Sequence, residues 1–199
     1  MSRMKLFLCV CLLMSVVTGP AYADDCNIVR YVDNLDGTMT DCRSNLIWLK
    51  NANCKDVSNS ILPDSTHGYL DWYYAMKWVK GLQHGICGLT DGSSAGDWRL
   101  PTKTEWMAMV ISAKKQSFTW PALTNAAGTA KWTNSQTWDF QDVVEFYYWS
   151  STTSPFDTGH AWYLYMVNGS WYEGTKAYYF NFWPVRGGQS ASFDSLTLE

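Results

Sequence analysis

The stretch that predicts most about the fold reads Gly96-Asp97-Trp98-Arg99-Leu100-Pro101-Thr102-Lys103-Thr104-Glu105-Trp106. Leu100 precedes a proline and therefore favours extended backbone, so the chain enters the stretch without helix. Thr102 and Glu105 are spaced as a capping box, in which each side chain accepts a hydrogen bond from a backbone amide at the helix start. The stretch therefore predicts an extended entry followed by a helix over residues 103–113.

Two segments carry apolar residues at helical spacing. Trp106, Met109 and Val110 fall on one face of the capped helix, and residues 70–82 show a second apolar face with the same period. Arg99 has no charged neighbour in the sequence that explains it. We therefore expect Arg99 to have a structural role and to pair with a buried carboxylate from a distant segment.

Strand signals lie on both sides of these helices. The expected strands are residues 27–32, 38–48, 161–167, 170–173 and 178–186. Hairpin turn signals, Asn34-Leu35-Asp36-Gly37 and Asn168-Gly169, separate the first two and the next two of these strands. Residues 116–143 show no clear period and are expected to be mostly loop. This order predicts an α+β domain with two helices and mixed, mainly antiparallel sheets.

The chain begins with the features of a secretory signal peptide. Residues 1–23 combine a basic start, an apolar core and the cleavage pattern Ala21-Tyr22-Ala23. The apolar core is shorter than the roughly 18 residues that a membrane-spanning helix needs. We therefore expect cleavage, no membrane span afterwards, one domain over residues 24–189 and a tail over residues 190–199. The expected location is secreted, periplasmic or on the cell surface.

Four cysteines remain after this cleavage, namely Cys26, Cys42, Cys54 and Cys87. An even number in an exported chain indicates two disulfides, and four cysteines allow three connectivities. We favour Cys26–Cys42, which would close the base of the first hairpin. Its complement, Cys54–Cys87, would tie a long loop to the chain after the first helix. No closely spaced cysteine pair of the zinc-binding type is present.

The charge balance argues against a nucleic-acid partner. The chain has 18 acidic and 15 basic residues, with no cluster of Lys and Arg. The acidic group Asp33, Asn34, Asp36 and Asp41 misses the spacing of a calcium loop, and the hairpin turn accounts for it. We expect no cofactor and no metal-ligating residue, although calcium elsewhere in the loops stays open.

Aromatic residues are concentrated in the C-terminal half, with 15 among the 39 positions of residues 145–183. The expected strand 161–167 is apolar or aromatic on both alternating faces, with Tyr163 and Tyr165 on one of them. A sheet with one solvated face should carry polar residues there. Either both faces are buried, or one of them is an exposed aromatic binding surface.

Three motifs occur in an order that resembles a known family. They are the stretch from Gly96 to Trp106, Tyr148-Trp149-Ser150-Ser151-Thr152-Thr153, and Trp183-Pro184-Val185-Arg186-Gly187-Gly188. Together they resemble the Lcl C-terminal domain family, named for the end domain of a bacterial collagen-like adhesin, from about Tyr31 to Gly188. The first motif is also similar to the formylglycine-generating enzyme family. Both resemblances imply a C-type-lectin-like fold, which the two disulfides would staple.

The resemblance implies a secreted or surface-associated binding module that recognises a glycan or a surface protein, as an adhesin does. Enzymes of the formylglycine-generating family bind copper through cysteines in their C-terminal half, and this chain has none after Cys87. We therefore expect no catalytic residue. Two alternatives stay open: a homo-oligomeric structural subunit with an aromatic interface, and a hydrolase with paired carboxylates among Glu145, Asp157 and Glu173.

Composition alone suggests which residues contact a ligand, because the family does not supply them. The candidates are polar or aromatic and lie on or beside the expected hairpin. They are Asp157, His160, Tyr163, Trp171, Tyr172, Lys176 and Tyr178.

Overall fold

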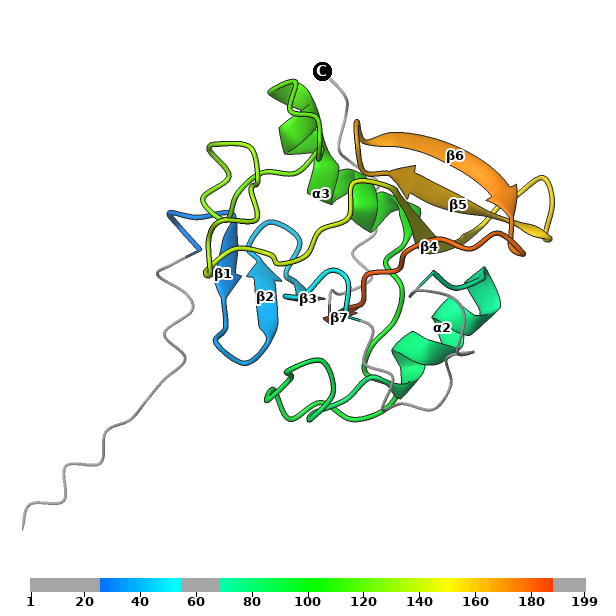
Figure 1. Ribbon diagram of the computed structural model, residues 1–199, viewed down its shortest axis with the longest axis horizontal. Coiled ribbons are helices and arrows are strands. Elements are labelled where there is room, and N and C mark those ends of the chain that lie inside the picture. Colours follow the sequence, from blue (N-terminus) through cyan, green and yellow to red (C-terminus); the bar gives the residue numbers. More distant parts are fainter. Residues whose placement is uncertain (1–25, 55–68, 188–199) are drawn as a thin grey trace, which may run out of the picture.

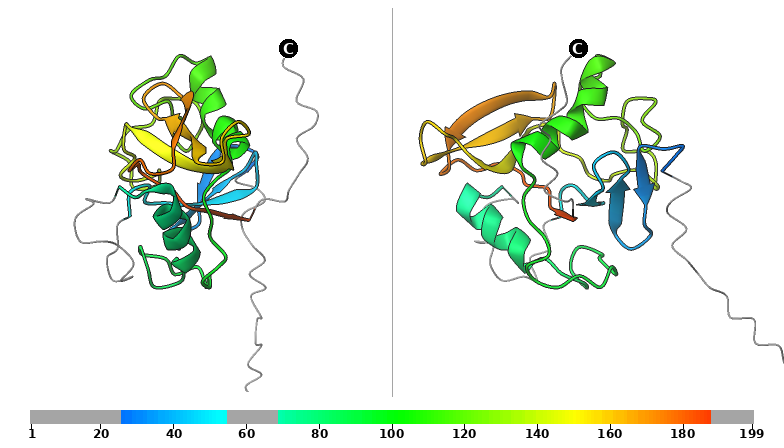
Figure 2. Two further views of the ribbon diagram at one scale, coloured as in Figure 1. Left: turned by 90° about the vertical axis from the view of Figure 1, so that its right-hand side faces the viewer. Right: turned by 180° about the vertical axis from the view of Figure 1, so that it is seen from behind.

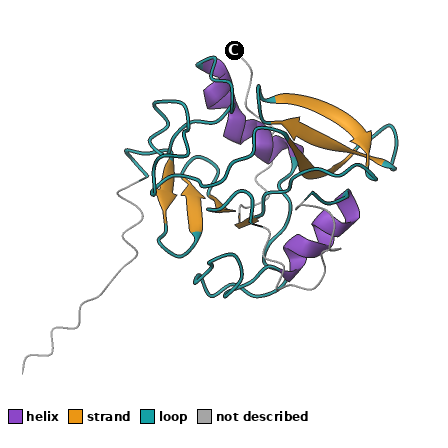
Figure 3. Cartoon of the chain, viewed as in Figure 1, coloured by secondary structure: helices purple, strands orange, loops and turns teal. Residues whose placement is uncertain are grey.

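The computed structural model describes residues 26–54 and 69–187 of the chain (Figure 1). These residues form two antiparallel sheets and two helices, which confirms the predicted α+β class (Figure 3). The two parallel contacts recorded, Asn51 with Gln141 and Tyr148 with Asn181, are isolated bridges. The predicted signal peptide, residues 1–23, and the predicted tail, residues 190–199, lie outside the described residues.

The first sheet brings the two ends of the described chain together. Its strands, in spatial order, are β1 (Tyr31–Asp33), β2 (Thr38–Asp41), β3 (Leu46–Leu49) and β7 (Val185–Gly187). All three pairings are antiparallel, and β7 joins β3 with Leu46 opposite Gly187. The last strand of the domain is therefore held by a strand of its N-terminal part.

The structure corrects the bounds of several expected strands. The strand expected over residues 27–32 is reduced to β1, because residues 26–30 form a turn and irregular backbone. Residues 38–48 do not form one strand, because a turn after Asp41 reverses the chain and starts β3. Asp41 accepts hydrogen bonds from the amides of Arg43 and Asn45 there, and Asn45 adopts a left-handed φ of 54°. Residues 178–184 are irregular and make single bridges at Phe180 and Asn181, so the expected strand 178–186 is reduced to β7.

The second sheet contains the predicted C-terminal hairpin. Its strands are β4 (Tyr147–Thr153), β5 (His160–Tyr165) and β6 (Ser170–Thr175), in that spatial order. β5 and β6 pair in register around the Asn168-Gly169 turn, with Tyr163 opposite Tyr172. The predicted hairpin is confirmed, but its loop spans residues 166–169, so β5 ends at Tyr165 and not at Val167 as expected.

Both helices have side-chain caps at their N-termini. Helix α2 (Trp72–Gly81) begins after Asp71, whose carboxylate accepts a hydrogen bond from the amide of Tyr74. Helix α3 (Lys103–Lys115) begins with the predicted capping box: Thr102 Oγ1 accepts from the amide of Glu105, and Glu105 accepts from the amide of Thr102. Helix α3 packs against β4 and β5, and α2 lies on the other side of the second sheet (Figure 2).

Arg99 pairs with a nearby carboxylate and not with a distant one, which corrects our expectation. Its guanidinium makes a bidentate ion pair with Glu105, at 2.6 and 2.8 Å. Burial of Glu105 opposes ionisation, but hydrogen bonds from Arg99 and from the amide of Thr102 outweigh it and hold the pKa of Glu105 below its usual value. The carboxylate of Glu105 therefore caps α3 and also holds Arg99 in the extended segment that leads into the helix.

The core is built around the indole of Trp183. Its ring centroid lies 4.8–6.0 Å from four other aromatic rings, those of Phe140, Trp48, Trp106 and Tyr148. The indole nitrogen donates a 2.7 Å hydrogen bond to the carbonyl of Leu49. The predicted apolar face of α3 is confirmed, because Trp106, Met109 and Val110 are all buried in this core.

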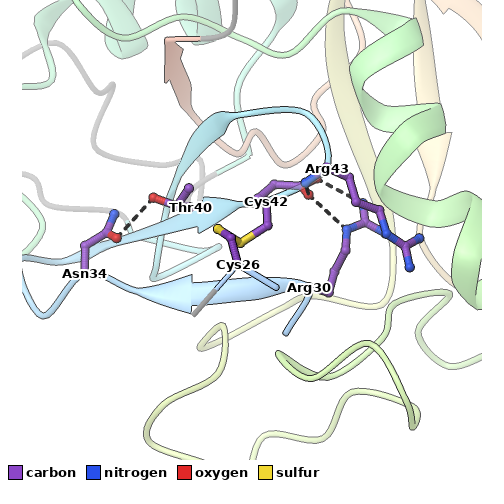
Figure 4. Close-up of a disulfide and its surroundings, with 7 residues drawn as sticks. Cys26, Arg30, Asn34, Thr40, Cys42 and Arg43 are labelled. Atoms are coloured by element: carbon purple, nitrogen blue, oxygen red, sulfur yellow. Dashed lines mark hydrogen bonds and ion pairs between the residues drawn. A yellow bond between two sulfur atoms is a disulfide. The ribbon is translucent and has the colours of Figure 1, made fainter. Parts of the chain in front are cut away.

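Both favoured disulfides are confirmed. Cys26–Cys42 closes the first hairpin beside β2, as Figure 4 shows, and Cys54–Cys87 joins the loop after β3 to the chain beyond α2. Next to the first disulfide, the buried Arg30 forms a bidentate ion pair with Asp41 and also bonds to Ser112 Oγ and the carbonyl of Ala108. These contacts attach the hairpin to α3.

The disulfides predict that the oxidised protein beginning at Asp24 has no free thiol. Titration with a thiol reagent under denaturing, non-reducing conditions should detect none, and peptide mapping should recover Cys26 with Cys42. Two or more free thiols would contradict this pairing.

Truncation of Trp106 should destabilise the fold strongly, because its ring is fully buried between both sheets. Trp106→Ala is expected to lower the free energy of unfolding by about 3–5 kcal/mol in a urea melt. The neighbouring Met107 is 45% exposed, so Met107→Ala should change it by less than about 0.5 kcal/mol. Equal effects of the two substitutions would refute the helix orientation.

The ion pair at Glu105 should make stability depend on pH. Its pKa is lower in the folded than in the unfolded chain, so the stabilisation is complete above about pH 4.3 and is lost as the pH falls through the folded-state pKa. Glu105→Gln should therefore destabilise the protein at pH 7 and progressively less in acid, as measured by urea melts at several pH values. Glu145→Gln, at an exposed carboxylate, is the matched control. A pH-independent loss in Glu105→Gln would point to packing and not to charge.

Candidate functional site

One face of the second sheet carries a continuous group of aromatic rings, which we call the tyrosine face. Its members are Phe146, Tyr147, Tyr163, Tyr165, Tyr172 and Tyr178. Alternation along β5 places Tyr163 and Tyr165 on the same side. The register places Tyr147 opposite Tyr165 and Tyr172 opposite Tyr163, so the rings of neighbouring strands meet on this side.

The rings contact one another across the strands. The ring centroid of Tyr147 lies 4.8 Å from that of Tyr165 and 5.2 Å from that of Tyr163. Tyr163 and Tyr172 are stacked at 5.8 Å with 26° between their planes. The outer members are open to solvent, since Phe146, Tyr172 and Tyr178 are 43%, 45% and 51% exposed. This is an aromatic surface and not a closed core.

The tyrosine face rests on buried rings and on a glycine. Phe180, from the segment after β6, lies 4.6 Å from Tyr163 and 4.7 Å from the buried Trp149. At Gly174 in β6, a Cβ would come within 2.9 Å of the Tyr163 ring and 3.1 Å of the Tyr178 ring. Glycine at this position therefore lets both rings lie over the strand, and the surface is held in place from below.

The hydroxyl groups of this face have hydrogen-bonding capacity to spare. Burial and the neighbouring phenols raise the pKa of Tyr163, so its hydroxyl is neutral and can both donate and accept. Within residues 26–54 and 69–187, no hydroxyl of the tyrosine face bonds to another described residue. The face therefore combines apolar ring surfaces with polar hydroxyl groups, which is the combination found at binding surfaces.

The opposite face of the second sheet is covered. Leu164 and Tyr148 are buried on this side, where α3 packs. At its margin, the ammonium of Lys103 lies 3.0 Å from the ring centroid of Trp162 and 6.0 Å from that of Trp171. Desolvation lowers the pKa of Lys103 in this position. The rings of Trp162 and Trp171 on this face are therefore already in contact with a cation of the protein, the ammonium of Lys103.

The structure brings three of the seven predicted site residues together on the tyrosine face and places the other four away from it. Tyr163, Tyr172 and Tyr178 are on the tyrosine face. Trp171 is on the opposite side of β6 from Tyr172 because side chains alternate along a strand. It packs against the core and, at its margin, faces Lys103.

The three charged or titratable candidates lie beyond the end of the tyrosine face. Asp157, in the connection between β4 and β5, and His160, the first residue of β5, form a 2.7 Å hydrogen bond between Oδ2 and Nδ1. Lys176 is buried, donates to Thr153 Oγ1 and lies 4.0 Å from the ring centroid of Trp72. Desolvation lowers the pKa of Lys176, and its contacts indicate a packing role.

Sequence reasoning missed three members of the tyrosine face as site residues. Tyr165 was detectable, because the Asn168-Gly169 turn and the alternation of β5 place it beside Tyr163. Phe146 and Tyr147 were not, because the register of β4 shifts between Trp149 and Thr153 and a long connection separates β4 from β5. No local turn signal specifies that register.

The acidic residues of the first hairpin already have partners within the protein. Asp33 pairs with Lys50 at 2.6 Å, Asp36 accepts from Thr38, and Asp41 is bonded to Arg30. Among the residues the structure describes, no group of three or more His, Cys, Asp or Glu side chains is arranged to hold a metal ion. In the same residues, no helix is long and apolar enough to cross a membrane.

Comparison with known proteins identifies the family. A search of curated proteins finds no match to the chain. The model of the Lcl C-terminal domain family matches residues 37–186, which include both helices, the whole second sheet and most of the first. The match spans more than half of the chain and confirms the family expected from the three motifs. The chain belongs to the Lcl C-terminal domain family.

Proposed function

We propose that the protein is an exported, non-catalytic binding module that recognises glycans through its tyrosine face. The observation that carries this proposal is a sheet face of six adjacent aromatic rings, half-buried or exposed, whose hydroxyl groups bond to no other residue that the structure describes. Sugars present flat C–H surfaces that stack on such rings, and their hydroxyl groups bond to phenol oxygens. Family membership supports the choice of a surface-binding role.

Export and a C-type-lectin-like fold are parts of the same proposal. Two disulfides favour an oxidising compartment such as the periplasm or the cell exterior. The pairing of β7 with β3, which closes the domain at its ends, supports a fold of the C-type-lectin type. Under this proposal, the helices and the first sheet form the scaffold and the second sheet presents the site.

The arrangement of the carboxylates supports binding without catalysis. A glycosidase of the usual kind needs two carboxyl groups that face each other across the bond to be cleaved. Glu173 bonds to Ser154 and belongs to the side of β6 away from Tyr172, while Asp157 is engaged by His160. Glu145 is exposed at the start of the aromatic segment. None of these contacts joins two of the three carboxylates that were considered for a hydrolase.

A homo-oligomer that buries the tyrosine face is the second candidate function. Exposed rings are a normal component of protein interfaces as well as of sugar sites. Size-exclusion chromatography with light scattering separates the two: a stable oligomer that dissociates in Tyr172→Ala and binds no glycan favours the structural role.

The glycan proposal predicts opposite outcomes for two adjacent residues. On a glycan array and in titrations with its best hit, Tyr172→Ala should weaken binding by roughly 0.5–1.5 kcal/mol with an unchanged thermal midpoint. Trp171→Ala should leave the affinity unchanged and lower the thermal midpoint, because Trp171 packs on the other side of β6. Tyr74→Ala, an exposed tyrosine on α2, is the control for nonspecific ring effects.

Binding should be weak for a single site and should increase when the glycan or the protein is multivalent. If Tyr172→Ala binds as the parent does, the tyrosine face is not the glycan site.

A further inference from the structure

A cavity of about 730 Å³ lies beside β1, away from the tyrosine face. Its lining comes from residues 28–33 on one side and from residues 125–139 on the other. In Figure 1, β1 and the tyrosine-bearing strands β5 and β6 are at opposite ends of the molecule. The volume of the cavity lies in the range of sites that bind small molecules, which combine an apolar lining with a few polar groups.

Hydrogen bonds within the protein hold the two sides of this cavity together. The carbonyl of Ala126 accepts from the amides of Arg30 and Tyr31, at 2.9 and 2.8 Å. The amides of Ala126 and Phe140 donate to the carboxylate of Asp139, at 3.0 and 2.8 Å. The backbone on both sides is therefore fixed, and so is the position of this carboxylate.

The carboxylate of Asp139 is buried without a cation bonded to it. Asp139 lines the cavity and is 1% exposed. Within residues 26–54 and 69–187, its hydrogen-bond partners are the two backbone amides, and no Lys, Arg or His side chain forms an ion pair with it. Burial raises the pKa of Asp139, and these amides and the charge of Lys50 offset the rise only in part. A positive charge beside this carboxylate would offset the cost of burying it.

The basic residues near the cavity are bonded to other groups. Lys50 forms a 2.6 Å ion pair with Asp33, which also lines the cavity. Lys131, another residue of the lining, donates its ammonium hydrogens to two backbone carbonyls. The lining thus holds the carboxylates of Asp33 and Asp139 against the ammonium of Lys131, and this balance favours a cationic ligand.

The rest of the lining is largely apolar. Ile28 and Val32 come from one side of the cavity, and Ala130 and Trp138 come from the other. Ile28 and Trp138 are 81% and 60% exposed, so a ligand can reach both side chains. An indole ring also attracts an organic cation over its face. A ligand with an apolar body and one positive charge therefore matches both the apolar lining and Asp139.

We propose that this cavity binds a small amphipathic amine, whose ammonium group pairs with Asp139 and whose apolar body contacts Ile28 and Trp138. An ammonium group has three donors, and each oxygen of the Asp139 carboxylate accepts one hydrogen bond and has room for another. Hydrogen bonds between two charged groups are stronger than neutral ones. The site is separate from the tyrosine face and does not depend on glycan binding there.

An NMR titration of the oxidised, 15N-labelled protein with 2-phenylethylamine at pH 7 tests this proposal. The amine should shift the amide signals of Ala126 and Phe140, because both amides donate to Asp139. The matched probe is 2-phenylethanol, which has the same shape without the charge. It should bind about tenfold more weakly, because it offers Asp139 one neutral donor in place of a charged group.

Two pairs of variants locate the bound amine. Asp139→Asn should remove the preference for the amine over the alcohol, whereas Asp97→Asn, at an exposed carboxylate outside the cavity, should keep it. Ala130→Trp fills the cavity and should abolish binding of the amine, whereas Thr129→Trp, on an exposed residue that does not line it, should leave binding intact. Tyr172→Ala should bind the amine as the parent does.

Three results would each overturn the proposal. They are unchanged signals of Ala126 and Phe140 on addition of the amine, equal affinities for the amine and the alcohol, and parental binding by Ala130→Trp. If Asp139→Asn does not fold, the comparison of Ala130→Trp with Thr129→Trp decides.

Discussion

The packing of Trp183 is the contact on which the rest of the structure depends. Its ring joins four parts of the chain, because it touches Trp48 of β3, Trp106 of α3, Tyr148 of β4 and Phe140 of the long loop. Each of these rings removes a large apolar area from water, and edge-to-face pairs add to that gain. The indole nitrogen of Trp183 donates a hydrogen bond to the carbonyl of Leu49, so the one polar atom of this side chain is not left buried without a partner.

This arrangement explains why the tyrosine face exists. β4 directs Tyr148 toward Trp183 and α3, and alternation then directs Tyr147 to the opposite side of the sheet. On that side, the short segment around Phe180 reaches Tyr147, Trp149 and Tyr163, and α2 packs against β4. The sheet is therefore fully packed on one face and partly covered on the other, where its outer rings remain exposed.

The parts of the fold that could be predicted are those with local causes. The capping box at Thr102, the apolar face of α3 and the Asn168-Gly169 hairpin each follow from residues close in sequence, and each is confirmed. The break between β2 and β3 was missed because it depends on Asp41, which is buried against Arg30 and turned into the following amides. The site was only partly predicted. Which of Trp171 and Tyr172 faces the core depends on the side of the sheet against which α3 packs, and no short motif specifies that side.

Rigidity is a feature of the tyrosine face, for which we propose a binding function. Phe180 and Gly174 support this face from below. A site that is already ordered loses less conformational entropy when a ligand binds, so a weak contact such as one stacked ring can give measurable affinity. Under the proposed function, the aromatic core around Trp183 therefore contributes to binding indirectly, because it holds the sheet that carries these rings.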